Sequence, residues 1–203
     1  MESLLSCYFP TKIIIVDDDE RILRGIKPIL NYQTATYDFF TDPSKALELI
    51  NSTKSTEFVE ACDSSEEKIY GLHKLMYNPN RFEEISTVIV DYKMPMMDGL
   101  EFCEKIKNPY IRKILFTGVA DESIAIEAFN KGLIDGYIKK QDPHKSKAIN
   151  DFIHTSQRKY FQKLTDILVG TILKEFTALD PKETALFDPA FIEYFNNLIK
   201  EKN

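Results

Sequence analysis

The sequence predicts an open, doubly wound parallel α/β sheet, and three observations lead to this prediction. Short apolar runs alternate with segments whose apolar residues recur every three or four positions. The first run contains Ile13, Ile14, Ile15 and Val16 in succession, which is typical of a strand covered by helices on both faces. Short turns separate most of these segments, so strands and helices follow one another as in a parallel α/β domain.

Five strands are expected, at residues 12–16, 34–40, 85–90, 113–116 and 134–138. Four helices are expected between them, at residues 20–30, from Pro43 onward, around 100–106 and at 123–130. Asp19 precedes the first helix and can cap it with its side chain. Proline is favoured at the first position of a helix, so Asp42-Pro43 marks the start of the second.

Two stretches interrupt this alternation. Residues 52–84 are too long for a connection within a compact domain. An inserted helical segment is expected there, because four apolar residues lie at helical spacing: Ile69, Leu72, Leu75 and Met76. A second helical stretch starts at Asp142-Pro143 and meets no strong breaker before Asp180-Pro181, and another amphipathic helix is expected at 189–200. The expected division is a domain at residues 1–150 and a helical extension at residues 151–203.

The helical extension carries a broad apolar stripe. Its central positions approximate a heptad seam, and further apolar residues widen it: Ile153, Tyr160, Leu164, Ile167 and Thr171, then Phe161, Leu168 and Ile172. A protruding helix with such a stripe would expose it to water, so we expect a homodimer through this helix. The alternative is that the stripe folds back onto the domain or onto residues 189–200.

Composition limits the classes of function. The chain has 203 residues, of which 43% are hydrophobic, enough to bury a core without disulfides or metal. Its formal net charge is −6, and the extension lacks helix-turn-helix spacing, so direct binding to nucleic acid is not expected. Three scattered cysteines are typical of free thiols. The sequence has no signal peptide or long apolar run, so we expect a cytoplasmic protein without a membrane partner.

The chemically informative residues stand where the apolar runs end, because ligands of an open α/β sheet bind beyond the carboxyl ends of its strands. These ends carry three carboxylates, a hydroxyl and an ammonium: Asp17, Asp18, Asp91, Thr117 and the lysine at Lys139-Lys140. Clustered carboxylates repel one another unless a cation such as Mg²⁺ lies between them. A hydroxyl and an ammonium suit the oxygens of a phosphoryl group. Solvated strand caps would explain any one of these residues, but not all of them at one edge.

This arrangement resembles the receiver domain of two-component response regulators. The resemblance lies in Val16-Asp17-Asp18, in Asp91-Tyr92-Lys93-Met94-Pro95-Met96-Met97-Asp98-Gly99, in Thr117-Gly118 and in the lysine of the fifth strand. It is closest in pattern to receivers found with metal-dependent phosphohydrolase output domains. The resemblance implies a flavodoxin-like sheet with strand order 2-1-3-4-5, here with a helical insertion after the second helix and a C-terminal helical extension.

The resemblance also implies roles for these residues. Asp91 would accept a phosphoryl group from a histidine kinase or a phosphotransfer protein. The carboxylates of Asp17, Asp18 and Asp91 would hold Mg²⁺ together with the backbone carbonyl of Lys93. Thr117 would bind a phosphoryl oxygen, and Thr117 and Tyr137 would shift on activation. The domain would then be a phosphorylation-dependent switch rather than an enzyme, with at most Mg²⁺-dependent self-phosphorylation and autodephosphorylation.

Two lysines compete for the phosphate-binding position. A gap-free alignment with the family pattern puts Tyr137 at the switch aromatic and Lys140 at the lysine, while Lys139 falls on the opposite face of an alternating strand. Lys140 is favoured and Lys139 stays open. Gln141 replaces the proline that normally follows this lysine through a cis bond. The Lys140–Gln141 bond is therefore expected either as trans with a reshaped loop or as a strained cis bond.

Two other interpretations are weighed against this one. A haloacid-dehalogenase-like phosphohydrolase would use Asp17 as the nucleophile and Asp19 as the general acid, but it leaves the Asp91 motif unexplained. A degenerate receiver acting only as a scaffold conflicts with the complete set of acidic, threonine and lysine positions. The output domain, the cognate kinase and the pathway do not follow from these residues, and an output domain beyond this sequence is left open.

Overall fold

The computed structural model of the chain describes residues 5, 8–53, 70, 74, 77–118, 122–175 and 188–201. The chain divides into two compact units. The sheet unit consists of Pro10–Lys54 and Phe82–Gln157, and the second unit of Met1–Phe9, Ser55–Arg81 and Arg158–Asn203. Among the described helices, none combines the length and the apolarity that a membrane crossing requires.

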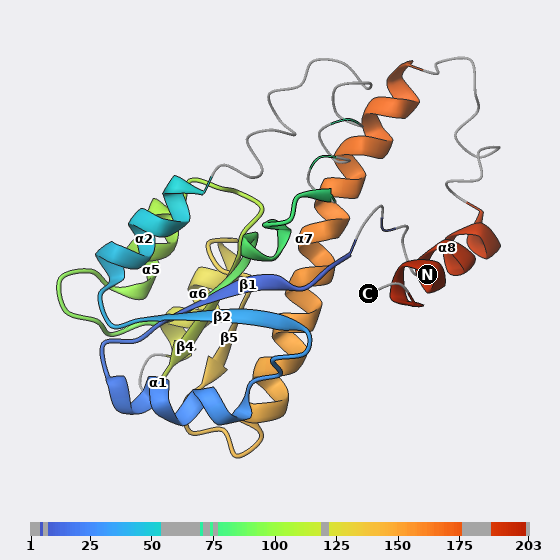
Figure 1. The fold of residues 1–203 in the computed structure, drawn as a ribbon. Helices are drawn as coiled ribbons and strands as arrows, with labels where there is room; N and C mark the ends of the chain where they lie inside the picture. Colours follow the sequence, from blue (N-terminus) through green and yellow to red (C-terminus); the bar gives the residue numbers. More distant parts are fainter. Residues whose placement is uncertain are drawn as a thin grey trace. The chain divides into compact units, whose positions relative to one another are not determined.

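The sheet unit is built on five parallel strands in the order β2-β1-β3-β4-β5 (Figure 1). The strands are β1 (Thr11–Val16), β2 (Ala35–Phe40), β3 (Ile85–Asp91), β4 (Arg112–Thr117) and β5 (Gly136–Lys139). The chain passes from β1 to β2 on one side and then returns to β3 on the other. The strand order therefore reverses between β1 and β3, which is where open α/β sheets bind their ligands. The predicted fold class and strand order are confirmed.

Helices cover both faces of this sheet. They are α1 (Glu20–Ile26) with the 3-10 turn η1 (Lys27–Ile29), α2 (Pro43–Ser52), α5 (Gly99–Lys105), α6 (Glu122–Asn130) and α7 (Lys145–Glu175). A short turn η2 (Arg81–Glu83) precedes β3, and α8 (Pro189–Glu201) belongs to the second unit. Asp19 caps α1 through its side chain, as predicted, and Asp42 caps α2 in the same way, just before the predicted start at Pro43.

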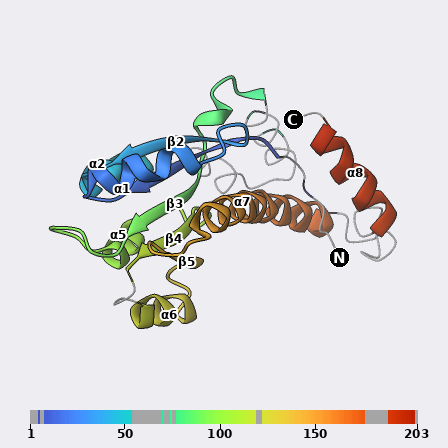
Figure 2. The same cartoon turned by 90° about the horizontal axis from the view of Figure 1, so that it is seen from below.

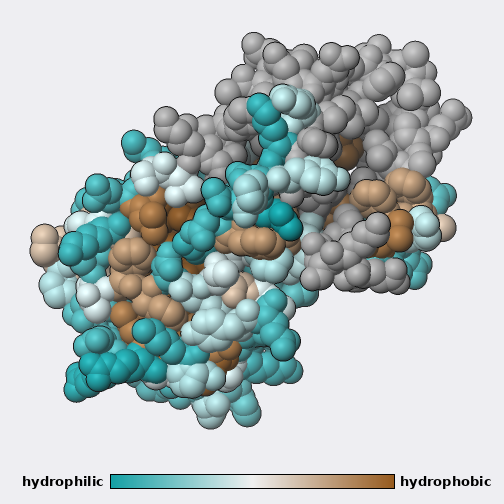
Figure 3. All heavy atoms as spheres, viewed as in Figure 1, coloured by the Kyte–Doolittle hydropathy of each residue, from teal (hydrophilic) through white to brown (hydrophobic). Residues whose placement is uncertain are grey.

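Alternate residues of the strands enter two apolar clusters, one on each face. On one face Val16 and Val90 pack with buried residues of α2, α5 and α6, such as Phe102. On the other face Ile15 and Ile89 pack with α1 and with the first turns of α7. Figure 2 shows the sheet from below, and Figure 3 shows apolar side chains reaching the visible surface of the sheet unit between hydrophilic ones. The two-sided core explains why the central strands are apolar throughout.

The starts of β5 and α7 are among the element boundaries that differ from the prediction. β5 begins at Gly136 rather than at Ile134, because the carboxylate of Asp135 accepts the backbone N–H of Lys113 at 2.7 Å and pairs with Arg112 at 2.5 Å. The backbone N–H of Lys113 therefore donates to the Asp135 side chain instead of to a carbonyl of the neighbouring strand.

Helix α7 begins at Lys145, not at the predicted Pro143. The carboxylate of Asp142 accepts the N–H of His144 at 2.7 Å, and the carbonyl of Asp142 accepts the N–H of Lys145 at 3.1 Å. These bonds form a turn that contains Pro143 and precedes the helix. The helix then runs without interruption through residue 150.

Three of the five predicted seam positions on α7 are buried within a single chain, contrary to the premise of the predicted dimer, and Ile167 is half-buried. Ile153 is 2% exposed and packs on the sheet, and Tyr160 and Leu164 are 0% and 1% exposed. The buried ring of Phe161 meets the ring of Phe9 with centroids 4.7 Å apart. These positions favour the alternative in which the stripe packs within the chain.

Other apolar positions that the sequence prediction used lie outside the residues whose side chains the structure describes. The side chains of Leu168, Thr171 and Ile172 are not described. The same holds for the four residues that predicted the inserted helix: Ile69, Leu72, Leu75 and Met76.

Candidate functional site

Four strands deliver polar side chains to the carboxyl edge of the sheet. Asp17 directly follows β1, Asp91 is the last residue of β3, Thr117 is the last residue of β4, and Lys140 directly follows β5. Parallel pairing aligns these ends, since Asp91 is paired with Phe116 and Thr117 with Lys139. The predicted residues thus share one edge.

The carboxylates of Asp17, Asp18 and Asp91 form one cluster. One carboxylate oxygen from each residue lies within 4.8 Å of those from the other two. Asp17 and Asp91 are buried, at 1% and 6% exposure, whereas Asp18 is exposed. Burial raises the pKa of Asp17, and the neighbouring Lys140 opposes this rise. The backbone N–H of Asp19 donates to Asp17 Oδ1 at 3.0 Å and so fixes the orientation of that carboxylate.

Lys140 lies inside the cluster. Its Nζ is 2.7 Å from Asp17 Oδ2 and 2.9 Å from Asp91 Oδ1. Burial by itself would lower the pKa of Lys140, but the two carboxylates outweigh it and raise this pKa, so the ammonium stays charged. Lys139 instead pairs with Glu122 at 2.8 Å. The structure therefore separates the two lysines that the sequence left in competition.

The residues present fit a hard divalent cation. Asp17 Oδ2 is a buried oxygen that makes no hydrogen bond of good geometry, although it lies close to the ammonium of Lys140. The carboxylates of Asp17, Asp18 and Asp91 together offer oxygen ligands, which Mg²⁺ prefers. The carbonyl of Lys93, two residues after Asp91, belongs to the loop at the same strand end.

The loop after Asp91 is tightly built. The N–H of Gly99 donates to the carbonyl of Tyr92 at 2.9 Å. A Cβ on Gly99 would lie 2.3 Å from the carbonyl oxygen of Asp91, so only glycine fits there. Asp98 caps α5 by accepting the N–H of Leu100 at 2.9 Å. The end of the recognised motif therefore has a structural role, because it turns the chain closely behind Asp91.

Thr117 and Tyr137, the two predicted switch residues, lie on β4 and β5. Thr117 is fully buried, and its carbonyl accepts the backbone N–H of Lys140 at 2.9 Å, which ties the end of β4 to the lysine. Tyr137 is half-buried and packs against the apolar cluster that includes Ala125 and Ala128 of α6.

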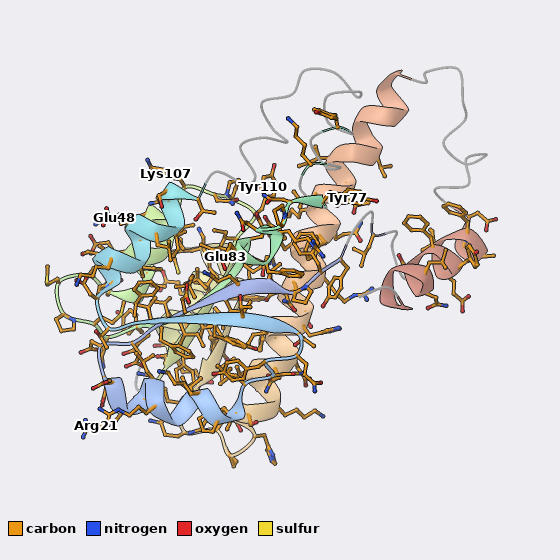
Figure 4. All side chains as sticks on the ribbon, in the orientation of Figure 1. Arg21, Glu48, Tyr77, Glu83, Lys107 and Tyr110 are labelled. Carbon is orange, nitrogen blue, oxygen red and sulfur yellow. The ribbon has the colours of Figure 1, made fainter. Side chains whose placement is uncertain are left out.

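Asp19 does not suit the general-acid role of the rival phosphohydrolase. Its carboxylate is held by Arg21, with Nη2 at 2.7 Å, and this contact lowers the pKa of Asp19 to about 2. An acid with this pKa is ionised at neutral pH and has no proton to give. Arg21 itself is exposed and points away from the sheet unit (Figure 4).

Two features of the β5–α7 loop went beyond the sequence prediction. The Lys140–Gln141 bond is trans, which decides between the two expected geometries. The ammonium of Lys145 donates to the carbonyl of Lys140 at 3.0 Å, a contact that the sequence prediction missed. The available signal was a lysine in the first turn of a helix, where acidic residues are the usual choice.

Comparison with known proteins gives consistent matches. Residues 73–149 match the response regulator receiver domain, a stretch that includes Asp91, Thr117 and Lys140. The chain is 38% identical over 68 residues, or 32% of its length, to the cyclic di-GMP phosphodiesterase response regulator RpfG of Xanthomonas campestris pv. campestris. This stretch covers 18% of RpfG.

Solved structures extend the likeness to nearly the whole chain. The Legionella pneumophila response regulator LqsR is similar over 98% of this chain and 58% of its own, with 39% identity and a TM-score of 0.74. The signal receiver domain of an HD domain-containing protein from Pseudomonas fluorescens Pf-5 shares the fold over 80% of this chain and 97% of its own. Its identity is 21% and its TM-score 0.56. The chain therefore spans less than two thirds of RpfG and of LqsR.

Proposed function

This chain carries a receiver domain of the response regulator family, and we propose that it works as a phosphorylation-dependent signalling switch with Asp91 as the phosphoacceptor. One observation supports this assignment above all. Asp91 shares a carboxylate cluster with Asp17 and Asp18, and its Oδ1 lies 2.9 Å from the ammonium of Lys140. A nucleophilic carboxylate beside a buried cation is what the transfer of a charged phosphoryl group requires.

The proposed transfer uses residues on three strand ends. A carboxylate oxygen of Asp91 forms the new P–O bond while the N–P bond of the phosphodonor breaks. The donor nitrogen keeps the electron pair and takes a proton from water. Lys140 neutralises charge on the phosphoryl oxygens, and the Thr117 hydroxyl binds one of them. Mg²⁺, held by Asp17, Asp18, Asp91 and the carbonyl of Lys93, supplies further neutralisation when it is bound.

The proposed partners follow from this chemistry. The phosphodonor is a histidine kinase or a phosphotransfer protein, and the chain works in the cytoplasm. The response consists of a shift of Thr117 and Tyr137, with no further enzymatic activity of the chain itself beyond self-phosphorylation and autodephosphorylation. A second copy of the chain stays a predicted partner, and the burial of Tyr160 and Leu164 argues against contacts with it at these two positions.

Phosphorylation of the whole chain tests the assignment. Incubation with phosphoramidate and Mg²⁺ should add one phosphoryl group by intact mass, and Asp91→Asn should abolish this gain. Asp151→Asn is the matched control, because Asp151 is an exposed carboxylate on α7. Normal labelling of Asp91→Asn would remove Asp91 as the phosphoacceptor. Steady turnover of small phosphate esters without a labelled protein would favour the phosphohydrolase instead.

A further inference from the structure

We infer that Lys145 is a positioning residue for phosphoryl transfer: its ammonium holds the backbone carbonyl of Lys140 and so keeps the Lys140 side chain directed at Asp91. This inference rests on the proposed function, in which Lys140 neutralises the phosphoryl group. Lys145 Nζ donates to Lys140 O at 3.0 Å, and Lys140 Nζ lies 2.9 Å from Asp91 Oδ1. The two contacts form a chain of three residues that ends at the proposed phosphoacceptor.

The carbonyl of Lys140 needs such a contact because Lys140 directly follows the last strand, and the sheet holds only its N–H. β5 ends at Lys139, and Lys140 is followed by Gln141, joined through a trans bond, in place of the proline typical of the resemblance. The peptide groups on either side of Lys140 are nevertheless held. Its N–H donates to the carbonyl of Thr117 at 2.9 Å, and its carbonyl accepts from Lys145. One contact comes from β4 and the other from α7, so the lysine is fixed between two elements.

The position of Lys145 is poor for helix stability, which argues that it serves another purpose. It occupies the first turn of α7, where the helix dipole disfavours a positive charge. That turn contains no acidic residue to offset it. Lys145 is only half-exposed, so ordering its long side chain also costs conformational entropy. The hydrogen bond to Lys140 is a contact that offsets these costs, because charge-assisted hydrogen bonds are stronger than neutral ones.

Substitution of Lys145 in the whole chain tests the inference through the rate of Asp91 labelling by phosphoramidate with Mg²⁺. Lys145→Met keeps the aliphatic stem and removes the donor, and we expect a rate about tenfold lower, as for other groups that orient a site residue. Lys145→Arg restores a charged donor and should recover most of the rate. Lys147→Met is the matched control, because Lys147 is an exposed lysine on the same turn, and it should label at the wild-type rate.

A double-substitution cycle separates positioning from a general structural effect. If Lys145 acts through Lys140, then Lys145→Met should have almost no further effect in a Lys140→Met background. An equal loss of rate in both backgrounds would overturn the inference. So would labelling of Lys145→Met at the rate of the Lys147→Met control. Should Lys145→Met unfold, Lys145→Ala, which also lacks the donor, takes its place in the same cycle. If the wild-type chain itself is not labelled, the proposed function fails, a distinguishable outcome.

Discussion

Burial and charge pairing have opposite effects on the pKa values of Asp17 and Lys140. Asp17 loses nearly all its solvent, which raises its pKa, while Lys140 keeps its charge because two carboxylates face it. Asp18 differs from both, since it is exposed and adds a third carboxylate to the cluster. It therefore offers a ligand for a cation without the cost of burying another charge.

Asp18→Ala should lower the affinity for Mg²⁺ by at least about tenfold, because even the loss of a group that merely orients a ligand has an effect of this size. Calorimetric titration of the whole chain with Mg²⁺ measures it. Asp151→Ala, which removes an exposed carboxylate from α7, serves as the control. An unchanged titration curve for Asp18→Ala would exclude this residue from the cation site.

At the scale of elements, α7 is held on the sheet unit by two amide side chains on one face. Asn150 donates to the carbonyl of Ile29 at 2.8 Å and accepts the N–H of Asn31 at 2.9 Å. Gln157, two turns further on, donates to Thr11 Oγ1 and to the carbonyl of Thr34, both at 3.0 Å. These polar contacts flank apolar ones and give the helix a single defined register.

Gln157→Leu should lower the free energy of unfolding by about 1–3 kcal/mol, because it removes two hydrogen bonds that a buried amide makes, each worth about 0.5–1.5 kcal/mol. Urea unfolding followed by circular dichroism measures this change. Gln33→Leu is the control, since Gln33 is exposed, and its effect should stay within about 0.5 kcal/mol. Equal stability of the two variants would show that the buried amide contributes little to the docking of α7.

For the whole molecule, α7 is the element that the two units share. Its 31 residues span about 46 Å at the usual rise of an α-helix. Residues up to Gln157 belong to the sheet unit, and those from Arg158 belong to the second unit. The buried side chains of Tyr160, Phe161 and Leu164 therefore contribute to the stability of the single chain.

Leu164→Ala should destabilise the chain by about 2–5 kcal/mol without changing its mass in solution, because Leu164 is buried within one copy. Thermal unfolding and light scattering on the same samples measure the two quantities. Ile126→Ala, at an exposed apolar position on α6, should have little effect on either. Conversion of a dimer into a stable monomer by Leu164→Ala would restore the dimer seam that the sequence predicted.

The sequence by itself determined the order of elements and the residues at the strand ends. The apolar runs of β1 and β3 and the caps Asp19 and Asp42 are local signals, because neighbouring residues fix backbone conformation and capping. Asp91 was found in the same way, from the Met-Pro-Met-Met-Asp-Gly stretch that follows it. These signals need no knowledge of distant contacts.

Only the tertiary structure decided which of several local options is used. Lys140 rather than Lys139 faces Asp17 and Asp91, because pairing with β4 sets the register of β5. The stripe of α7 is compatible with a dimer or with packing inside the chain, and the apolar partners that bury it come from distant parts of the sequence. The contact of Lys145 likewise depends on the turn before α7. Such choices depend on contacts between residues far apart in the chain, which a periodic pattern does not encode.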